Sequence, residues 1–262
     1  MNRADRPIGV FDSGIGGLTV VRALRRLLPG ESIVYLGDTA RVPYGAKSHE
    51  TIVRYTLQTG AILRNFDPKL LVIACNTASA HGLQALQAAS ACPVLGVIEP
   101  GAEAAAALPG PVGVLGTLAT VQSGAYEAAI RHRRPDAIIH SVACPLLVGL
   151  AEEGWLEDPI TEAVCRRYLN QLSFEVKHVV LGCTHYPLLL PSLNRARPGS
   201  AWIDSGTVAA QAVESMLRSI GFRTESARGP LRVLLTDASS RLQDVGETFL
   251  GEPLGKLEVV EL

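Results

Sequence analysis

Short runs of apolar, often β-branched residues alternate along the chain with longer stretches in which apolar residues recur at helical spacing. Unbroken apolar strands separated by helices are typical of parallel sheets that helices cover on both faces. The pattern therefore predicts an α/β fold. The expected strands are 8–11, 33–37, 70–74, 94–97, 112–115, 137–142, 178–182 and 232–236. The expected helices are 17–28, 48–65, 119–131, 159–172, 206–219 and 240–250.

Two pairs of segments indicate an internal repeat. GVFDSG at 9–14 aligns with GVLGTL at an offset of 104, and VIACNT at 72–77 aligns with VLGCTH at an offset of 108. One loop insertion between duplicated halves would produce such a pair of offsets. A Pro- and Gly-rich segment around an Ala-rich helix near 98–111 suggests the boundary. We expect two pseudo-symmetric, three-layer α/β domains with mainly parallel sheets and an active site in the cleft between them. The expected domains are 1–98 together with 208–262, and 99–207.

Charge and hydropathy narrow the class of protein. The 262 residues carry 24 Lys and Arg against 25 Asp and Glu, a net charge of −1, with no block of like charges. This balance argues against a nucleic-acid partner and against a polybasic membrane patch. The first residues contain no apolar signal-peptide core, and no run of 18 apolar residues follows. We therefore expect a soluble, cytoplasmic protein.

The five cysteines are too irregularly spaced for a disulfide framework or a zinc knuckle, so we expect free thiols. Cys92, Cys144 and Cys165 are expected to pack as small hydrophobic residues. Cys75 and Cys183 differ from them, because each follows a buried strand at matching points of the repeat. Ligands bind at the carboxyl ends of strands in open α/β sheets, and a helix N-terminus there favours a carboxylate and lowers the pKa of a thiol.

Two thiols at equivalent strand ends indicate one acid/base group on each side of a substrate carbon. Such a pair can remove a proton from one face and return a proton to the other, which is racemisation or epimerisation. A hydrolase with a cysteine nucleophile has no need of the second cysteine. Only four lysines are present, which limits any proposal of pyridoxal phosphate, and the histidines show no ligand spacing. We expect neither a cofactor nor a metal.

Other polar residues lie beside these strand ends. Asp12 and Ser13 follow the first strand in DSGIGG, which lacks the third glycine of a dinucleotide fingerprint. We expect both to face the cleft, with Asp12 exchanging a proton with a thiol, although Asp12 could instead be only a helix cap. His185 and Glu152 are the expected helpers of Cys183. The loop GDTARVPYG at 37–45 is interpreted as a substrate loop, or alternatively as a surface turn.

The segments GVFDSGIGGLTV, GDTARVPYG, ACNTASA, CPLLVGLAEEG and LGCTHYPLL, in this order, resemble glutamate racemases of the aspartate/glutamate racemase superfamily. The resemblance implies an enzyme that interconverts L- and D-glutamate without a cofactor. It also implies that the D-glutamate serves peptidoglycan synthesis and that the enzyme is a homodimer. It implies that Cys75 acts on the D-enantiomer and Cys183 on the L-enantiomer, assisted by Asp12, His185 and Glu152. Gly149 stands where proline is usual in the family. The substrate contacts that it implies are Asp12, Ser13, Tyr44, Gly45, Asn76, Thr77, Thr117, Thr184 and His185.

Two alternatives remain open on the sequence. The first is a racemase of the same superfamily that acts on aspartate or a hydantoin. The second is a non-catalytic small-molecule binding protein on a bilobed α/β scaffold, although a binding protein has no need of a thiol pair.

Overall fold

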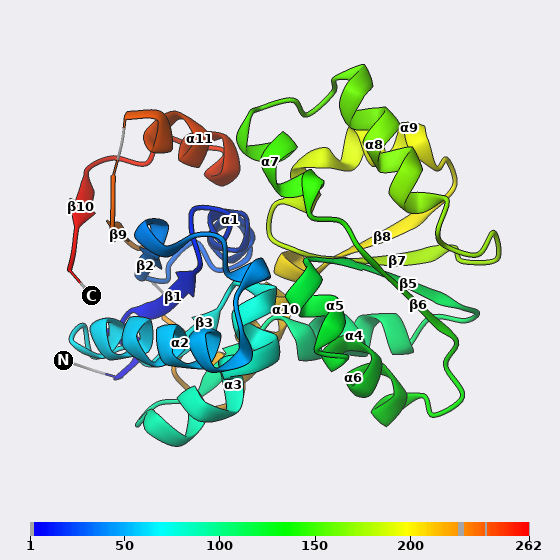
Figure 1. Ribbon diagram of the computed structural model, residues 1–262. Helices are drawn as coiled ribbons and strands as arrows, with labels where there is room; N and C mark the ends of the chain where they lie inside the picture. The colour runs from blue at the N-terminus through cyan, green and yellow to red at the C-terminus, as the bar shows by residue number, and fades with distance from the viewer. Residues whose placement is uncertain (1–2, 225–227, 239, 262) are drawn as a thin grey trace.

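The computed structural model describes residues 3–224, 228–238 and 240–261, which form two parallel sheets in separate halves of the molecule (Figure 1). The first sheet has the strand order β10-β9-β2-β1-β3-β4 and the second has the order β6-β5-β7-β8. The strands are β1 (Ile8–Asp12), β2 (Ile33–Gly37), β3 (Leu70–Ile73), β4 (Val94–Gly96), β5 (Val112–Gly116), β6 (Ile139–Ala143), β7 (His178–Gly182), β8 (Ala201–Asp204), β9 (Leu231–Leu235) and β10 (Leu257–Val259).

The two sheets repeat one topology and one register. In each, a first strand lies between the second and the third, and the fourth pairs with the third. Gly9 of β1 pairs with Leu71 of β3, and Gly113 of β5 pairs with Val179 of β7. These pairings keep the offsets of 104 and 108 found in the sequence. The internal repeat is therefore a repeat of structure, and it places Cys75 and Cys183 at corresponding strand ends.

Helices cover both faces of each sheet, as expected for buried parallel strands. Ile8 and Val10 of β1 pack in one apolar cluster with residues of α1, whereas Phe11 packs in another with residues of α2. The α/β class and the three layers are confirmed. The helices are α1 (Leu18–Leu27), α2 (His49–Arg64), α3 (Asn76–Ala89), α4 (Ile98–Ala106), α5 (Leu118–Gln122), α6 (Ala125–Arg133), α7 (Leu146–Glu152), α8 (Pro159–Leu169), α9 (Leu190–Ala196), α10 (Ser205–Ser219) and α11 (Ser240–Leu250), with the 3₁₀ helices η1 (Arg3–Asp5), η2 (Thr39–Arg41), η3 (Tyr44–Ala46) and η4 (Tyr186–Leu189).

Two helices cross between the halves. Helix α4 follows β4 of the first sheet but packs on α6 and β7 of the second half, and α10 follows β8 of the second sheet but packs on α1 of the first half. The two crossing helices also contact each other. The two halves are thus joined by α4 and α10, each of which follows a strand of one half and packs on the other half.

Some elements differ from the expectation. The helix expected over 119–131 is two helices, α5 and α6, because Gly124 between them has a φ of 63° and ends the regular backbone. Strands β8 and β10 were absent from the sequence prediction, and both are short, with at least one exposed residue. The strand ends that carry Cys75 and Cys183 lie where the pattern placed them.

Candidate active site

Cys75 occupies the N-cap position of α3, and only Ala74 separates it from the end of β3. Its Sγ atom accepts a hydrogen bond from the backbone N–H of Ala78 at 3.4 Å and lies 3.5 Å from Oγ of Ser13. The residue is only 5% exposed. This burial, together with the negative charge of Asp12, raises the pKa of the Cys75 thiol to about 12. The expectation that the helix N-terminus lowers the pKa of this thiol is therefore wrong for Cys75, whose burial outweighs it and favours the protonated thiol at neutral pH.

Asp12 is the last residue of β1 and is fully buried. Its Oδ2 atom accepts a hydrogen bond from the backbone N–H of Gly14 at 3.1 Å, whereas Oδ1 has no hydrogen-bond partner among the described residues. Burial raises the pKa of Asp12, and the positive charge of His185 opposes that rise. An unpartnered, buried carboxylate oxygen costs free energy and is well suited to accept a proton.

Cys183 has a different neighbour. It follows β7, and its Sγ atom lies 3.7 Å from Nδ1 of His185. Nε2 of the same imidazole lies 2.9 Å from Oε1 of Glu152, and the ring of Phe249 packs edge-on against it. Burial favours the neutral imidazole, but the contacts with Cys183 and Glu152 prevail and raise the pKa of His185 to about 10. A cationic side chain therefore lies beside the second cysteine at neutral pH.

Both cysteines line one cavity of about 430 Å³. This volume lies in the range of small-molecule sites, roughly 300–1,000 Å³. Asp12 is not on the cavity wall, so the expectation that it faces the cleft is not met; Gly14 and Ser13 line the cavity instead. The other expected site residues are brought together on the wall: Ser13, Tyr44, Gly45, Cys75, Asn76, Thr77, Thr117, Glu152, Cys183, Thr184 and His185.

Threonine hydroxyls join the two halves at this wall. Oγ1 of Thr77, at the start of α3, lies 2.8 Å from Oγ1 of Thr117, which caps α5. Thr120 completes the cluster at 3.1 Å from Thr77 and 2.9 Å from Thr117. Because Thr77 belongs to the first half and Thr117 to the second, the cavity depends on how the halves meet.

Asn76 also connects the two halves, because its side-chain amide makes hydrogen bonds within the protein in addition to lining the cavity. Its Oδ1 atom accepts a hydrogen bond from the hydroxyl of Tyr126 at 2.7 Å, and its Nδ2 atom donates to Oγ of Ser205 at 3.4 Å. Asn76 and Ser205 are buried, and Tyr126 is nearly fully buried. The amide side chain is thus held by the protein on both of its polar atoms.

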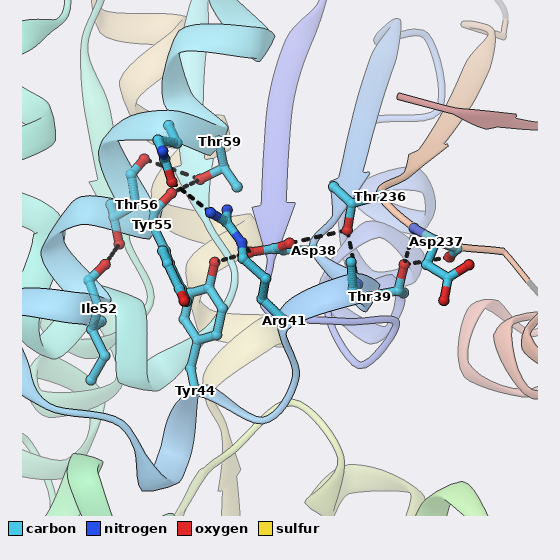
Figure 2. A network of polar contacts seen from close by, with 12 residues as sticks. Asp38, Thr39, Arg41, Tyr44, Ile52, Tyr55, Thr56, Thr59, Thr236 and Asp237 are labelled. Atoms are coloured by element: carbon cyan, nitrogen blue, oxygen red, sulfur yellow. Dashed lines mark hydrogen bonds and ion pairs between the residues drawn. The ribbon is translucent and has the colours of Figure 1, made fainter. Parts of the chain in front are cut away.

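Tyr44 lines the cavity, and its hydroxyl donates to Oδ2 of the buried Asp38 (Figure 2). Asp38 itself is one of the residues that the sequence did not single out. Asp38 comes directly after β2, and Asp12 is the last residue of β1, so a carboxylate at the carboxyl end of a strand was the available signal.

Apart from Glu152, the lining residues from α7 and from the loop before it were not predicted from the sequence. Pro145, Val148 and Gly149 face the cavity together with Glu152. Helix α7 is regular through Gly149, where an added Cβ would meet no atom within 4 Å, and it carries Glu152 to His185. These apolar residues show no chemical signature in the sequence, so only the fold reveals their position.

The cysteine assignments divide as expected, with one correction. All five cysteines are free. Cys144 and Cys165 are buried in the apolar core, whereas Cys92 is only partly buried beside it. Within the described ranges, no group of three or more His, Cys, Asp or Glu side chains could hold a metal ion, and no helix is long and apolar enough to cross a membrane.

This arrangement can carry out proton transfer at a carbon atom. One wall presents a thiol that stays protonated, and the other presents a cysteine beside a cationic imidazole.

The family model for Asp/Glu/hydantoin racemases matches residues 8–213. The glutamate racemase of Geobacter metallireducens is 45% identical over 98% of this chain and 97% of its own.

The chain belongs to the glutamate racemase family. The solved glutamate racemase of Francisella tularensis, described in complex with D-glutamate, has a TM-score of 0.92 and 38% identity, covering 98% of both chains. An aspartate racemase from Picrophilus torridus has a TM-score of 0.59 at 19% identity over 82% of this chain and 94% of its own, which is a likeness of fold alone.

Proposed function

We propose that this protein interconverts L- and D-glutamate by two-cysteine acid/base catalysis. The observation that carries the proposal is the pair of cysteines at corresponding ends of β3 and β7, both on the wall of one cavity. Family membership supports glutamate as the substrate, because the similar proteins are glutamate racemases. The alternative, a racemase that acts on aspartate or a hydantoin, is supported only by a likeness of fold to an aspartate racemase at 19% identity.

In the L-to-D direction, Cys183 as thiolate removes the α-proton, and the electron pair of the C–H bond stays on the α-carbon. The Cys75 thiol then gives its proton to the opposite face, so one C–H bond breaks and another forms. In the reverse direction the roles exchange, with Cys75 acting on D-glutamate. The high pKa of Cys75 suits the donor role in the resting enzyme.

The neighbours of each cysteine complete the proton transfers. We assign His185, oriented by Glu152, to Cys183, because the imidazole contacts both. We assign Asp12 to Cys75, because its charge acts on that thiol. The carbanionic transition state is stabilised by exclusion of water and by hydrogen bonds to the substrate carboxylate from the wall. The groups proposed for those bonds are Ser13, Asn76, Thr77, Thr117, Thr184 and the backbone at Tyr44 and Gly45.

We further propose the domain division 1–98 with 208–262, and 99–207. The crossing helices support it, since α4 begins at Ile98 and packs on the second half, while α10 begins at Ser205 and packs on the first. We also propose that the protein is a cytoplasmic homodimer whose D-glutamate serves peptidoglycan synthesis, as the resemblance of its motifs to glutamate racemases implies.

The test is circular dichroism of L-glutamate, D-glutamate, L-aspartate and D-aspartate incubated separately with the purified protein. We expect the two glutamate signals to decay to zero and the aspartate signals to persist. Racemisation of aspartate at an equal or greater kcat/KM would transfer the proposal to the alternative substrate. A constant signal for every substrate would refute the activity.

A further inference from the structure

The wall that carries Tyr44 is held from behind by the returning C-terminal segment. Oδ2 of the buried Asp38 accepts hydrogen bonds from the Tyr44 hydroxyl and from Nε of Arg41, the latter at 2.7 Å. Its other oxygen, Oδ1, accepts from Oγ1 of Thr236 at 3.0 Å. Thr236 directly follows β9, about two hundred residues along the chain from the loop that it contacts.

A second set of contacts joins the same two segments. Oγ1 of Thr236 accepts a hydrogen bond from the backbone N–H of Ala40 at 2.9 Å. Next to it, the hydroxyl of Thr39 donates to the carbonyl of Asp237 and accepts from the backbone N–H of Asp237 at 2.9 Å. Figure 2 shows this chain of contacts running from Tyr44 through Asp38 to Thr236. The loop thus has several fixed points on the turn after β9.

The other side of the loop is fixed on α2 and meets the second half. The Arg41 guanidinium lies 3.8 Å from the centre of the Tyr55 ring and donates to Gln58 at 2.5 Å. At the tip, a Cβ on Gly45 would lie 2.8 Å from Cβ of Thr117, so the loop approaches the second half as closely as a glycine permits. A shift of this loop would therefore move both the Tyr44 ring and the contact between the halves.

We propose that Thr236 is a positioning residue for the reaction, which holds the cavity loop 38–46 in place through Asp38. The inference rests on the proposed racemisation for its kinetic consequence. Thr236 does not line the cavity, and its hydroxyl reaches the site only through the Asp38 carboxylate and the Ala40 backbone. A loop held in place contacts the substrate equally in the ground state and in the transition state. Loss of the hydrogen bonds that hold the loop should therefore raise KM and leave kcat nearly unchanged.

The test compares Thr236→Val with Thr236→Ser and with Thr248→Val as a matched control. Valine keeps the shape of threonine but removes the hydroxyl, while serine keeps the hydroxyl. Thr248 is an exposed threonine of α11 whose hydroxyl bonds only a carbonyl of its own helix. Loss of hydrogen bonds of this kind predicts a rise in KM for glutamate of about threefold to tenfold in Thr236→Val, with kcat within about twofold. Serine should restore the wild-type KM.

A second readout is independent of catalysis. Release of the loop should expose the peptide bond after Arg41 to trypsin, so Thr236→Val should be cut there faster than wild type or Thr248→Val. Unchanged KM and unchanged cleavage, or a fall in kcat with KM unchanged, would overturn the proposal. If the wild type fails to racemise glutamate while Thr236→Val is still cut faster after Arg41, the positioning role stands and the proposed function fails.

Discussion

The two cysteine sites share a place in the fold but differ in their chemical surroundings. Cys75 and Cys183 follow third strands whose register against the first strand is the same in both sheets. Cys75 lies beside Ser13 and is influenced by the buried carboxylate of Asp12, whereas Cys183 lies beside the imidazole of His185. The repeated backbone thus places a carboxyl group near one cysteine and an imidazole beside the other.

The two cysteine sites therefore have the same backbone structure but different protonation states in the neighbouring side chains. On the first side, burial and a negative charge keep the thiol protonated. On the second side, the contacts with Cys183 and Glu152 keep the imidazole protonated, so a positive charge lies beside Cys183. In the proposed mechanism one cysteine acts as base while the other acts as acid, and the two sites differ in the charge beside the cysteine although their backbone is the same.

The largest expected effect follows from removing either cysteine. Cys75→Ala or Cys183→Ala should each lower kcat for racemisation in both directions by about 10³-fold or more, because each proton transfer by a positioned group contributes roughly 10²–10⁴. Circular dichroism of both enantiomers is the measurement, with the partly buried Cys92→Ala as the control. Activity of either variant close to that of Cys92→Ala would contradict the pairing.

Asp12→Asn tests the first side. The change removes the charge but keeps the size and an oxygen that can accept from Gly14. The pKa of Cys75 should fall, so alkylation of Cys75 by iodoacetamide at pH 8 should become faster, as followed by mass spectrometry. Racemisation should nevertheless fall about 10²-fold, because the buried carboxylate no longer exchanges a proton. Faster alkylation combined with full activity would confine Asp12 to an electrostatic influence.

Glu152→Gln tests the second side through the pH profile. In the wild type the raised pKa of about 10 keeps His185 cationic from neutral pH to near pH 10, where the alkaline limb of kcat/KM should appear. Without the carboxylate the pKa falls toward its ordinary value, so the limb should move to lower pH, with about a tenfold loss for each pH unit beyond it. The surface variant Glu157→Gln should keep the wild-type profile. A limb that does not move would separate Glu152 from the titration of His185.

Much of this account could be predicted from the sequence, for physical reasons that differ between elements. Unbroken apolar runs predict buried parallel strands, so the strand ends with Cys75 and Cys183 could be identified from the sequence. Strand β8 was not, since it is short and begins with an exposed alanine. The polar residues of the cavity wall were predicted. Asp38, which contacts Thr236 from the far end of the chain, was not predicted, and neither was Thr120 of the threonine cluster. No local pattern reports such a contact.

In the proposed reaction two different groups act on the α-carbon, one on each face: one removes a proton and the other donates a different proton. The most direct measurement is the reaction of L-glutamate in D₂O with the wild-type protein, stopped at low conversion and analysed by chiral separation and mass spectrometry. We predict that the D-glutamate formed carries deuterium at the α-carbon while the recovered L-glutamate carries almost none. Product that retains the original α-hydrogen, or equal labelling of substrate and product, would contradict the two-cysteine mechanism.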